Sequence, residues 1–114
     1  MQPNQDGNVP FLPSNVVYIF TPNDASGTWE VKEVTGSVHP GKIFSCFAMI
    51  LNQIFLFGSD TGAFDLTDAL STLDSFGHFE RLSPKGEIPA PRRDHQGFAY
   101  EGKLFIVGGY VKQV

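Results

Sequence analysis

The sequence predicts an all-β protein built from a repeated unit of about 50 residues. Short segments with strand patterns alternate with turns rich in glycine, proline, asparagine and aspartate. Phenylalanine is abundant, with 11 among 114 residues, and large aromatic side chains suit packed β-sheets. Matching residues recur 50 or 51 positions apart, which indicates that the same structural unit occurs more than once.

The clearest unit spans residues 88–110. It begins with a proline-rich loop, after which residues 98–100 alternate between large and small side chains, as in a β-strand. Glu101-Gly102 can supply the positive φ of a tight hairpin turn. The apolar run 104–107 predicts a second strand covered on both faces. Gly108-Gly109 then lets the backbone bend where a side chain would clash.

An upstream copy of this unit is the run FSCFAMILNQIFLFGS, residues 44–59, which repeats the strand–turn–strand–glycine pattern. The pairs Trp29/Phe79, Gly36/Gly86 and Gly58/Gly108 are 50 positions apart, and the pairs Pro40/Pro91 and Phe47-Ala48/Phe98-Ala99 are 51 apart. Because an insertion in a turn costs little, we expect the one-residue difference to fall at the turn Leu51-Asn52.

The unit resembles the kelch repeat, a four-stranded blade of a β-propeller. The residues that carry the resemblance are Pro91, Arg92, Arg93 and His95 before the first strand, and Gly108, Gly109 and Tyr110 after the second. The upstream copy is less regular, with Phe44 in place of His95, Gly41-Lys42 in place of Arg92-Arg93, and Ser59 in place of Gly109. In kelch blades the residue at the position of His95 makes a local hydrogen bond at the start of the innermost strand.

This resemblance divides the chain into four segments. Residues 1–14, rich in proline, asparagine and glutamine, are expected to form a flexible arm. Residues 15–34 supply the third and fourth strands of a blade. Residues 35–83 form a complete blade, and residues 84–114 hold the first two strands of the next one.

In the segment 15–34, the apolar run Val16–Phe20 and the alternating run Trp29–Val34 predict two strands. Thr21–Thr28 is composed of turn residues and is expected to connect them. In the complete blade, the run Leu66–Asp74 is compatible with a helix or a strand. The resemblance makes it the third strand, and it places Phe79 at the usual tryptophan position of the fourth.

Two blades cannot close a propeller ring, because each would leave an apolar face without a neighbour. We therefore expect either an excerpt of a larger kelch protein or several copies that assemble. Three copies would supply six blades. A small β-sandwich is the alternative architecture.

Composition restricts the function classes. The hydrophobic content of 41% is that of a globular chain, and the net charge of −4 argues against a nucleic-acid surface. No apolar run is long enough to span a membrane. A single cysteine, Cys46, cannot form an internal disulfide and fits a reducing compartment, so we expect a cytoplasmic or nuclear protein.

The sequence offers no catalytic signature and no cofactor motif. His39, His78 and His95 lack the spacing of metal ligands, so no metal site is expected. Cys46 lies in an apolar strand and is expected to be a buried, unreactive thiol. The remaining candidates for acid–base chemistry are the carboxylates Asp60, Asp65, Asp68 and Asp74, which also suit turns and loops.

The resemblance implies a protein-interaction scaffold that binds a protein or peptide through the face carrying its loops. The candidate contacts are Arg92 and Arg93 before the first strand and Ser59, Asp60 and Tyr110 after the second strands. Arginine suits this role because its planar fork pairs bidentately with carboxylates, although either arginine could instead join neighbouring blades. The alternatives are part of an oxidase- or lyase-type propeller enzyme, and a truncated product without independent function. The proline-rich loop resembles kelch-domain-containing or host-cell-factor proteins more than the BTB-kelch adaptors.

Overall fold

The computed structural model describes residues 16–42, 46–62 and 65–111. Over these ranges the chain forms eleven strands and no helix, which confirms the predicted all-β class. The described part therefore holds no helix of the length and hydropathy that crossing a membrane requires. The chain divides into two units, the first ending at Glu33 and the second beginning at Val34.

The first unit contains one hairpin of two antiparallel strands, β1 (Val16–Asn23) and β2 (Ser26–Glu33). The expected turn Thr21–Thr28 is wrong, because these two threonines are paired across the hairpin. Their branched side chains favour extended backbone. The turn consists of Asp24-Ala25 alone, with Asp24 at φ 53, a left-handed conformation that aspartate tolerates.

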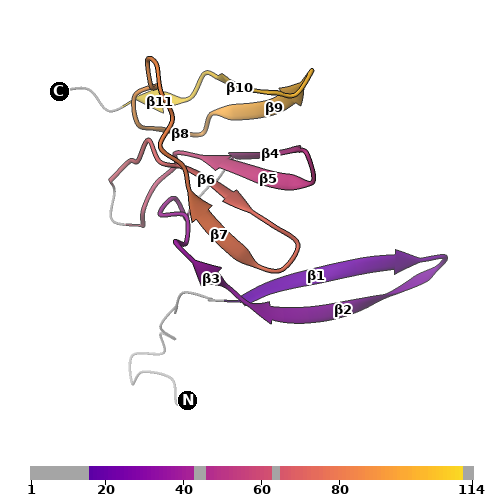
Figure 1. Ribbon diagram of the computed structural model, residues 1–114. Coiled ribbons are helices and arrows are strands. Elements are labelled where there is room, and N and C mark those ends of the chain that lie inside the picture. The colour runs from indigo at the N-terminus through magenta and orange to yellow at the C-terminus, as the bar shows by residue number, and fades with distance from the viewer. Residues whose placement is uncertain (1–15, 43–45, 63–64, 112–114) are drawn as a thin grey trace, which may run out of the picture. The chain divides into compact units, whose positions relative to one another are not determined.

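The second unit contains a complete four-stranded antiparallel blade, as predicted (Figure 1). Its strands are β4 (Cys46–Ile50), β5 (Gln53–Phe57), β6 (Leu70–Leu73) and β7 (His78–Arg81). Leu70–Leu73 is extended, so tertiary pairing with β5 decides the segment whose local pattern was ambiguous. A short strand, β3 (Thr35–Gly36), lies parallel to β7 and is the fifth strand of this sheet.

A half-blade follows the blade in the chain and stacks on it (Figure 1). It consists of β9 (Gln96–Tyr100) and β10 (Lys103–Val107), paired as an antiparallel hairpin. A second pair of short strands, β8 (Arg92–Arg93) and β11 (Tyr110–Val111), joins the loop before β9 to the loop after β10.

The turns of both hairpins form where the sequence predicts them. Leu51 and Asn52 have φ values of 51 and 63, and Glu101 and Gly102 have values of 51 and 72. Positive φ at both central residues defines the two-residue turn whose twist matches that of antiparallel strands. These two turns therefore fix the register of the hairpins β4–β5 and β9–β10.

The repeat spacing is 50 throughout these two hairpins. Ala48 pairs with Phe55, and Phe98 pairs with Phe105, so Ala48 corresponds to Phe98. The expected one-residue difference at the Leu51-Asn52 turn is therefore wrong. The extra residue falls between Lys42 and β4, in the segment 43–45, which lies outside the described residues together with Phe44. Because strand side chains alternate between faces, the corrected alignment puts Phe98 on the opposite face from Phe47.

The apolar core lies where the half-blade covers the blade. Ala48 and Phe57 face the half-blade and are 9% and 4% exposed. The equivalent positions of the half-blade, Phe98 and Val107, are 49% and 55% exposed, since no described strand covers them. On the other face of the blade, Phe47 is 64% exposed. The described structure thus has one covered junction between repeats and two uncovered faces.

Candidate functional site

Backbone hydrogen bonds tie the loop after β5 to the loop before β9. The N–H of Ser59 donates to the carbonyl of Arg92 at 2.8 Å, while the N–H of Gly58 donates within the blade to the carbonyl of Ala69 at 3.0 Å. Gly58 has φ +71, and a Cβ there would lie 3.1 Å from the Arg92 carbonyl oxygen. A glycine is therefore required where the two loops approach each other.

Two buried histidines flank this junction. Nε2 of His39 lies 2.9 Å from the carbonyl oxygen of Gly58, and Nε2 of His95 lies 2.7 Å from that of Phe57. Since a carbonyl can only accept, each Nε2 donates a hydrogen bond. In neutral His39 the other ring nitrogen, Nδ1, accepts from the hydroxyl of Ser71, at 2.7 Å.

The expected local hydrogen bond of His95 is wrong, because its partner Phe57 lies 38 residues away in the preceding blade. The imidazole also meets the Phe57 ring edge-on, with centroids 5.7 Å apart. Sequence reasoning missed the role of His39 altogether. The available signal was the polar pair Ser71-Thr72 inside a strand, since polar groups buried in a sheet need partners.

Burial lowers the pKa of His39, because the charged imidazolium loses its hydration. The hydrogen bond to Gly58 acts in the opposite direction, and repulsion from Arg81 and His95 lowers the pKa further. His39 is consequently neutral near pH 7, in agreement with its hydrogen-bond geometry.

Arg92 makes hydrogen bonds within its own repeat. Its side chain is half-buried; Nε donates to the carbonyl of Ala90 and Nη1 to that of Gly108, both at 3.1 Å. The guanidinium therefore links the proline-rich loop before β9 to the glycine bend after β10.

Arg93 points to a different environment. Its side chain is 47% exposed, and its guanidinium carbon lies 5.8 Å from the centroid of the Tyr110 ring, within the range of a cation–π contact. Nη1 lies 3.7 Å from a carboxylate oxygen of Asp94. Tyr110 is 67% exposed. The pairing of β8 with β11 holds the two side chains together on the surface.

The other two candidate contacts are placed differently. Ser59 is fully buried, and its backbone joins the two repeats. Asp60 caps its own loop, since Oδ1 accepts from the N–H of Gly62 at 2.7 Å. Its carbonyl also accepts from the N–H of Lys42 at 2.8 Å, which reproduces in the blade the link that Arg93 and Tyr110 make in the half-blade. We therefore define the loop surface by Arg93 and Tyr110.

The repeat positions identified in the sequence have structural roles. Trp29 packs on Phe20 across the hairpin, with ring centroids 5.0 Å apart. Phe79 is half-buried, and its carbonyl accepts from the N–H of Ser37. Pro40 and Pro91 are half-buried in the loops before the first strands.

The two glycines after β10 differ. Both have positive φ, 72 at Gly108 and 94 at Gly109. A Cβ on Gly109 would lie 2.7 Å from the Arg93 carbonyl oxygen and 2.8 Å from Cβ of His95, whereas one on Gly108 meets no described atom within 4 Å. The predicted clash with a side chain thus applies to Gly109 alone.

Asp74 stabilises the turn before β7. Oδ1 of Asp74 accepts from the N–H groups of Phe76 and His78, at 2.9 and 3.0 Å, as its turn position suggested. His78 contacts the hydroxyl of Thr35 at 2.9 Å.

The side chain of Cys46 lies outside the described part of the chain. Among the residues that are described, no three histidine, cysteine, aspartate or glutamate side chains gather as a metal would require.

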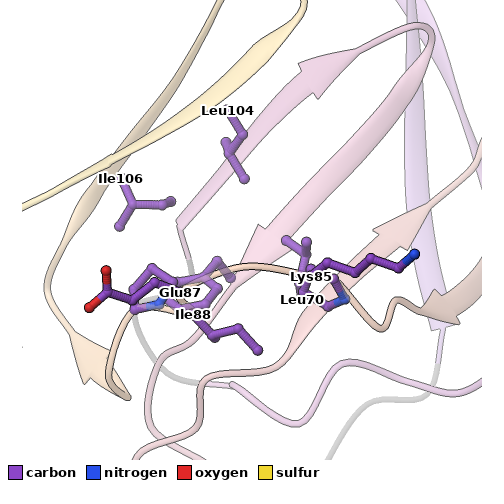
Figure 2. Close-up of a pocket in the computed structure, with 9 residues that line it drawn as sticks. Leu70, Lys85, Glu87, Ile88, Leu104 and Ile106 are labelled. Atoms are coloured by element: carbon purple, nitrogen blue, oxygen red, sulfur yellow. The ribbon is translucent and has the colours of Figure 1, made fainter.

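An apolar pocket of about 220 Å³ lies between the blade and the half-blade. Figure 2 shows Leu104 and Ile106 on one side of it and Leu70 and Ile88 on the other, with Lys85 and Glu87 beside them. Phe57, Pro84 and Pro89 complete the lining.

Comparison with known proteins relates this chain to one group of relatives. No protein-family model matches it. It is 31% identical over 106 residues to Kelch domain-containing protein 2 of Bos taurus and to that of Homo sapiens. The Rattus norvegicus protein of the same name is 30% identical over the same length. These alignments cover 88% of the chain and 25% of each relative, so the chain spans about a quarter of the length of the relatives it matches.

Proposed function

The chain belongs to the kelch-repeat family, and we propose that it acts as a protein-interaction module rather than as an enzyme. The partner that we propose is a peptide segment carrying a carboxylate. The observation behind this proposal is the exposed pair of Arg93 and Tyr110 on the loop surface.

The chemistry of this pair suits recognition. A guanidinium keeps its proton at neutral pH, so it binds anions but does not transfer protons. Its fork donates two hydrogen bonds to a carboxylate, and the Tyr110 ring orients that fork and adds an apolar surface. Asp94 competes weakly, because an exposed ion pair at 3.7 Å contributes only about 0–1 kcal/mol.

The test is a selection of displayed random peptides on the immobilised full chain, followed by affinity measurements with synthetic peptides. We expect peptides rich in aspartate or glutamate, and at least a tenfold loss of affinity in Arg93→Ala, since a charge-assisted hydrogen-bonded pair contributes about 1.5–3 kcal/mol. Arg93→Lys should keep only part of the wild-type affinity, because an ammonium group lacks the planar fork of a guanidinium.

Lys103→Ala is the matched control. Lys103 is an exposed cation at the start of β10, at the opposite end of that strand from the loop surface. Its removal changes net charge by the same amount as Arg93→Ala and should leave affinity unchanged. Equal losses in the two variants would mean that peptides respond to overall charge, and the proposed contact would be wrong.

A further inference from the structure

Strand β10 has one edge that no described strand covers. In the blade, the equivalent strand β5 pairs with β4 on one side and β6 on the other, whereas β10 pairs with β9 alone. The two-residue turn makes Tyr100 and Lys103 a hydrogen-bonded pair, and such pairs alternate along an antiparallel ladder. The backbone N–H and C=O groups of Leu104 and Ile106 therefore point to the open edge.

The apolar pocket lies beside this edge, because Leu104 and Ile106 line it with their side chains (Figure 2). The same place in the blade is filled. There Ser71 of β6 lies opposite Leu56, and the imidazole of His39 is hydrogen-bonded to the Ser71 hydroxyl. Leu56 corresponds to Ile106 at the spacing of 50, and His39 corresponds to Ala90 at the spacing of 51 that precedes the extra residue. An alanine lacks the imidazole that fills the space in the blade.

A strand that completes the half-blade should consequently carry a larger residue than serine at the position of Ser71. The pocket has room for it. A cavity of about 150 Å³ is enough to bind benzene, and this pocket measures about 220 Å³.

The hairpin β1–β2 has the required register. Trp29 corresponds to Phe79 at the spacing of 50; Phe79 lies opposite Leu73, and Trp29 lies opposite Phe20. Phe20 thus corresponds to Leu73, and Tyr18, two residues earlier, corresponds to Ser71. The aromatic side chain of Tyr18 is 63% exposed.

The backbone alternation agrees with this alignment. The two-residue turn after Asn23 makes Asn23 and Ser26 a hydrogen-bonded pair, so Tyr18 and Phe20 point their backbone groups away from β2. These groups would meet those of Ile106 and Leu104. Pro22 has no N–H, and in this register it falls beyond the first residue of β10, so it interrupts no hydrogen bond.

We propose that β1 of a second copy of the chain pairs antiparallel with β10, with Tyr18 opposite Ile106 and Phe20 opposite Leu104. The phenol ring of Tyr18 enters the pocket beside Pro89. Four large side chains then form two direct cross-strand pairs, each worth about 0.2–1 kcal/mol beyond alanine. In the described residues each copy offers the β1–β2 hairpin and the open edge of β10, so copies join head to tail. The composite blade has four strands, two from each copy.

Proline substitutions test this contact. Tyr18→Pro removes the N–H that faces the open edge of β1 while sparing the hydrogen bonds inside the hairpin. Val31→Pro is the matched control, because Val31 is the partner of Tyr18 in the register and points its N–H to the opposite edge. Ile106→Pro disables the acceptor strand. Far-UV circular dichroism of each variant reports whether the sheets form.

The measurement is mass by light scattering over a dilution series of full chains. We expect wild type and Val31→Pro to rise above the single-chain mass of 12.5 kDa as concentration increases. Tyr18→Pro and Ile106→Pro should each stay at that mass. A mixture of these two variants should form a complex of about twice that mass, since one supplies an intact hairpin and the other an intact edge.

Three results would overturn the proposal: wild type that stays monomeric at every concentration, a mixture that stays monomeric, or a Val31→Pro variant as impaired as Tyr18→Pro. If the proline variants fail to fold, Tyr18→Ala keeps the backbone and removes the ring. It should weaken association at least about tenfold, as loss of an aromatic anchor does. An unchanged dissociation constant in this variant would place Tyr18 outside the contact.

Discussion

Replacing Gly109 by alanine tests the packing between the glycine bend and the first strand of the half-blade. Alanine at this position combines two costs. A left-handed φ costs an ordinary residue about 1–2 kcal/mol, and Gly109 has φ 94. The added Cβ also lies 2.7 Å from a backbone oxygen of Arg93 and 2.8 Å from Cβ of His95, neither of which can move by side-chain rotation alone. Overpacking of this kind costs about 1–3 kcal/mol.

Gly108→Ala isolates the first cost, because Gly108 also has positive φ but its Cβ would meet no described atom within 4 Å. We expect losses of about 1 kcal/mol for Gly108→Ala and about 3 kcal/mol for Gly109→Ala, from the same two terms. At about 4–8 °C per kcal/mol, the melting temperatures should differ by about 8–16 °C. The assay is a thermal melt followed by circular dichroism. Equal melting temperatures would show that residues 92–95 shift freely, and the packing argument would be wrong.

Three further predictions concern contacts inside each repeat. Stability should fall as pH drops below 6.5, the pKa of histidine in the unfolded chain, toward the lowered pKa of buried His39, because the unfolded chain takes up the proton first. The urea midpoints at about pH 7.5 and pH 5.5 should differ less in His39→Gln than in wild type. A difference equal to that of wild type would exclude His39 as the cause. Gly41→Ala should destabilise by about 1–3 kcal/mol, since its Cβ would collide with the carbonyl oxygen of Gly58; a melting temperature equal to wild type would contradict this. Arg92→Ala should lower stability by about 1–3 kcal/mol through loss of two hydrogen bonds from a charged group. Arg93→Ala should lower stability by less than about 1 kcal/mol. Denaturant titrations that show the larger loss in Arg93→Ala would refute the structural role of Arg92.

The hairpins could be predicted because their signals are local. Glu101-Gly102 and the apolar run after it identify a tight turn and a strand without reference to the rest of the chain. The turn at Leu51-Asn52 was likewise found from its place in the repeat. Prediction was less accurate in the first unit, where Thr21 and Thr28 look like turn residues but pair as strand residues.

The loop surface was predicted only in part. Five residues were candidate contacts of one face, yet Ser59 joins the two repeats through its backbone, and the Arg92 side chain links two loops of its own repeat. Sequence alone could not separate Arg92 from Arg93, because adjacent residues of a strand point to opposite sides and the direction depends on the pairing of β8 with β11.

The sequence by itself determined the class of fold and the places of the tight turns in the second unit, since these depend on residues close together in the chain. Residues that recur 50 positions apart also showed the repeat. Tertiary structure decided the register of the repeat and therefore the faces on which Phe47 and Phe98 lie. It also decided the partners of the buried histidines, because the hydrogen bond from His95 reaches a carbonyl 38 residues away. A contact over that separation exists only after the half-blade has stacked on the blade, and no local pattern contains it.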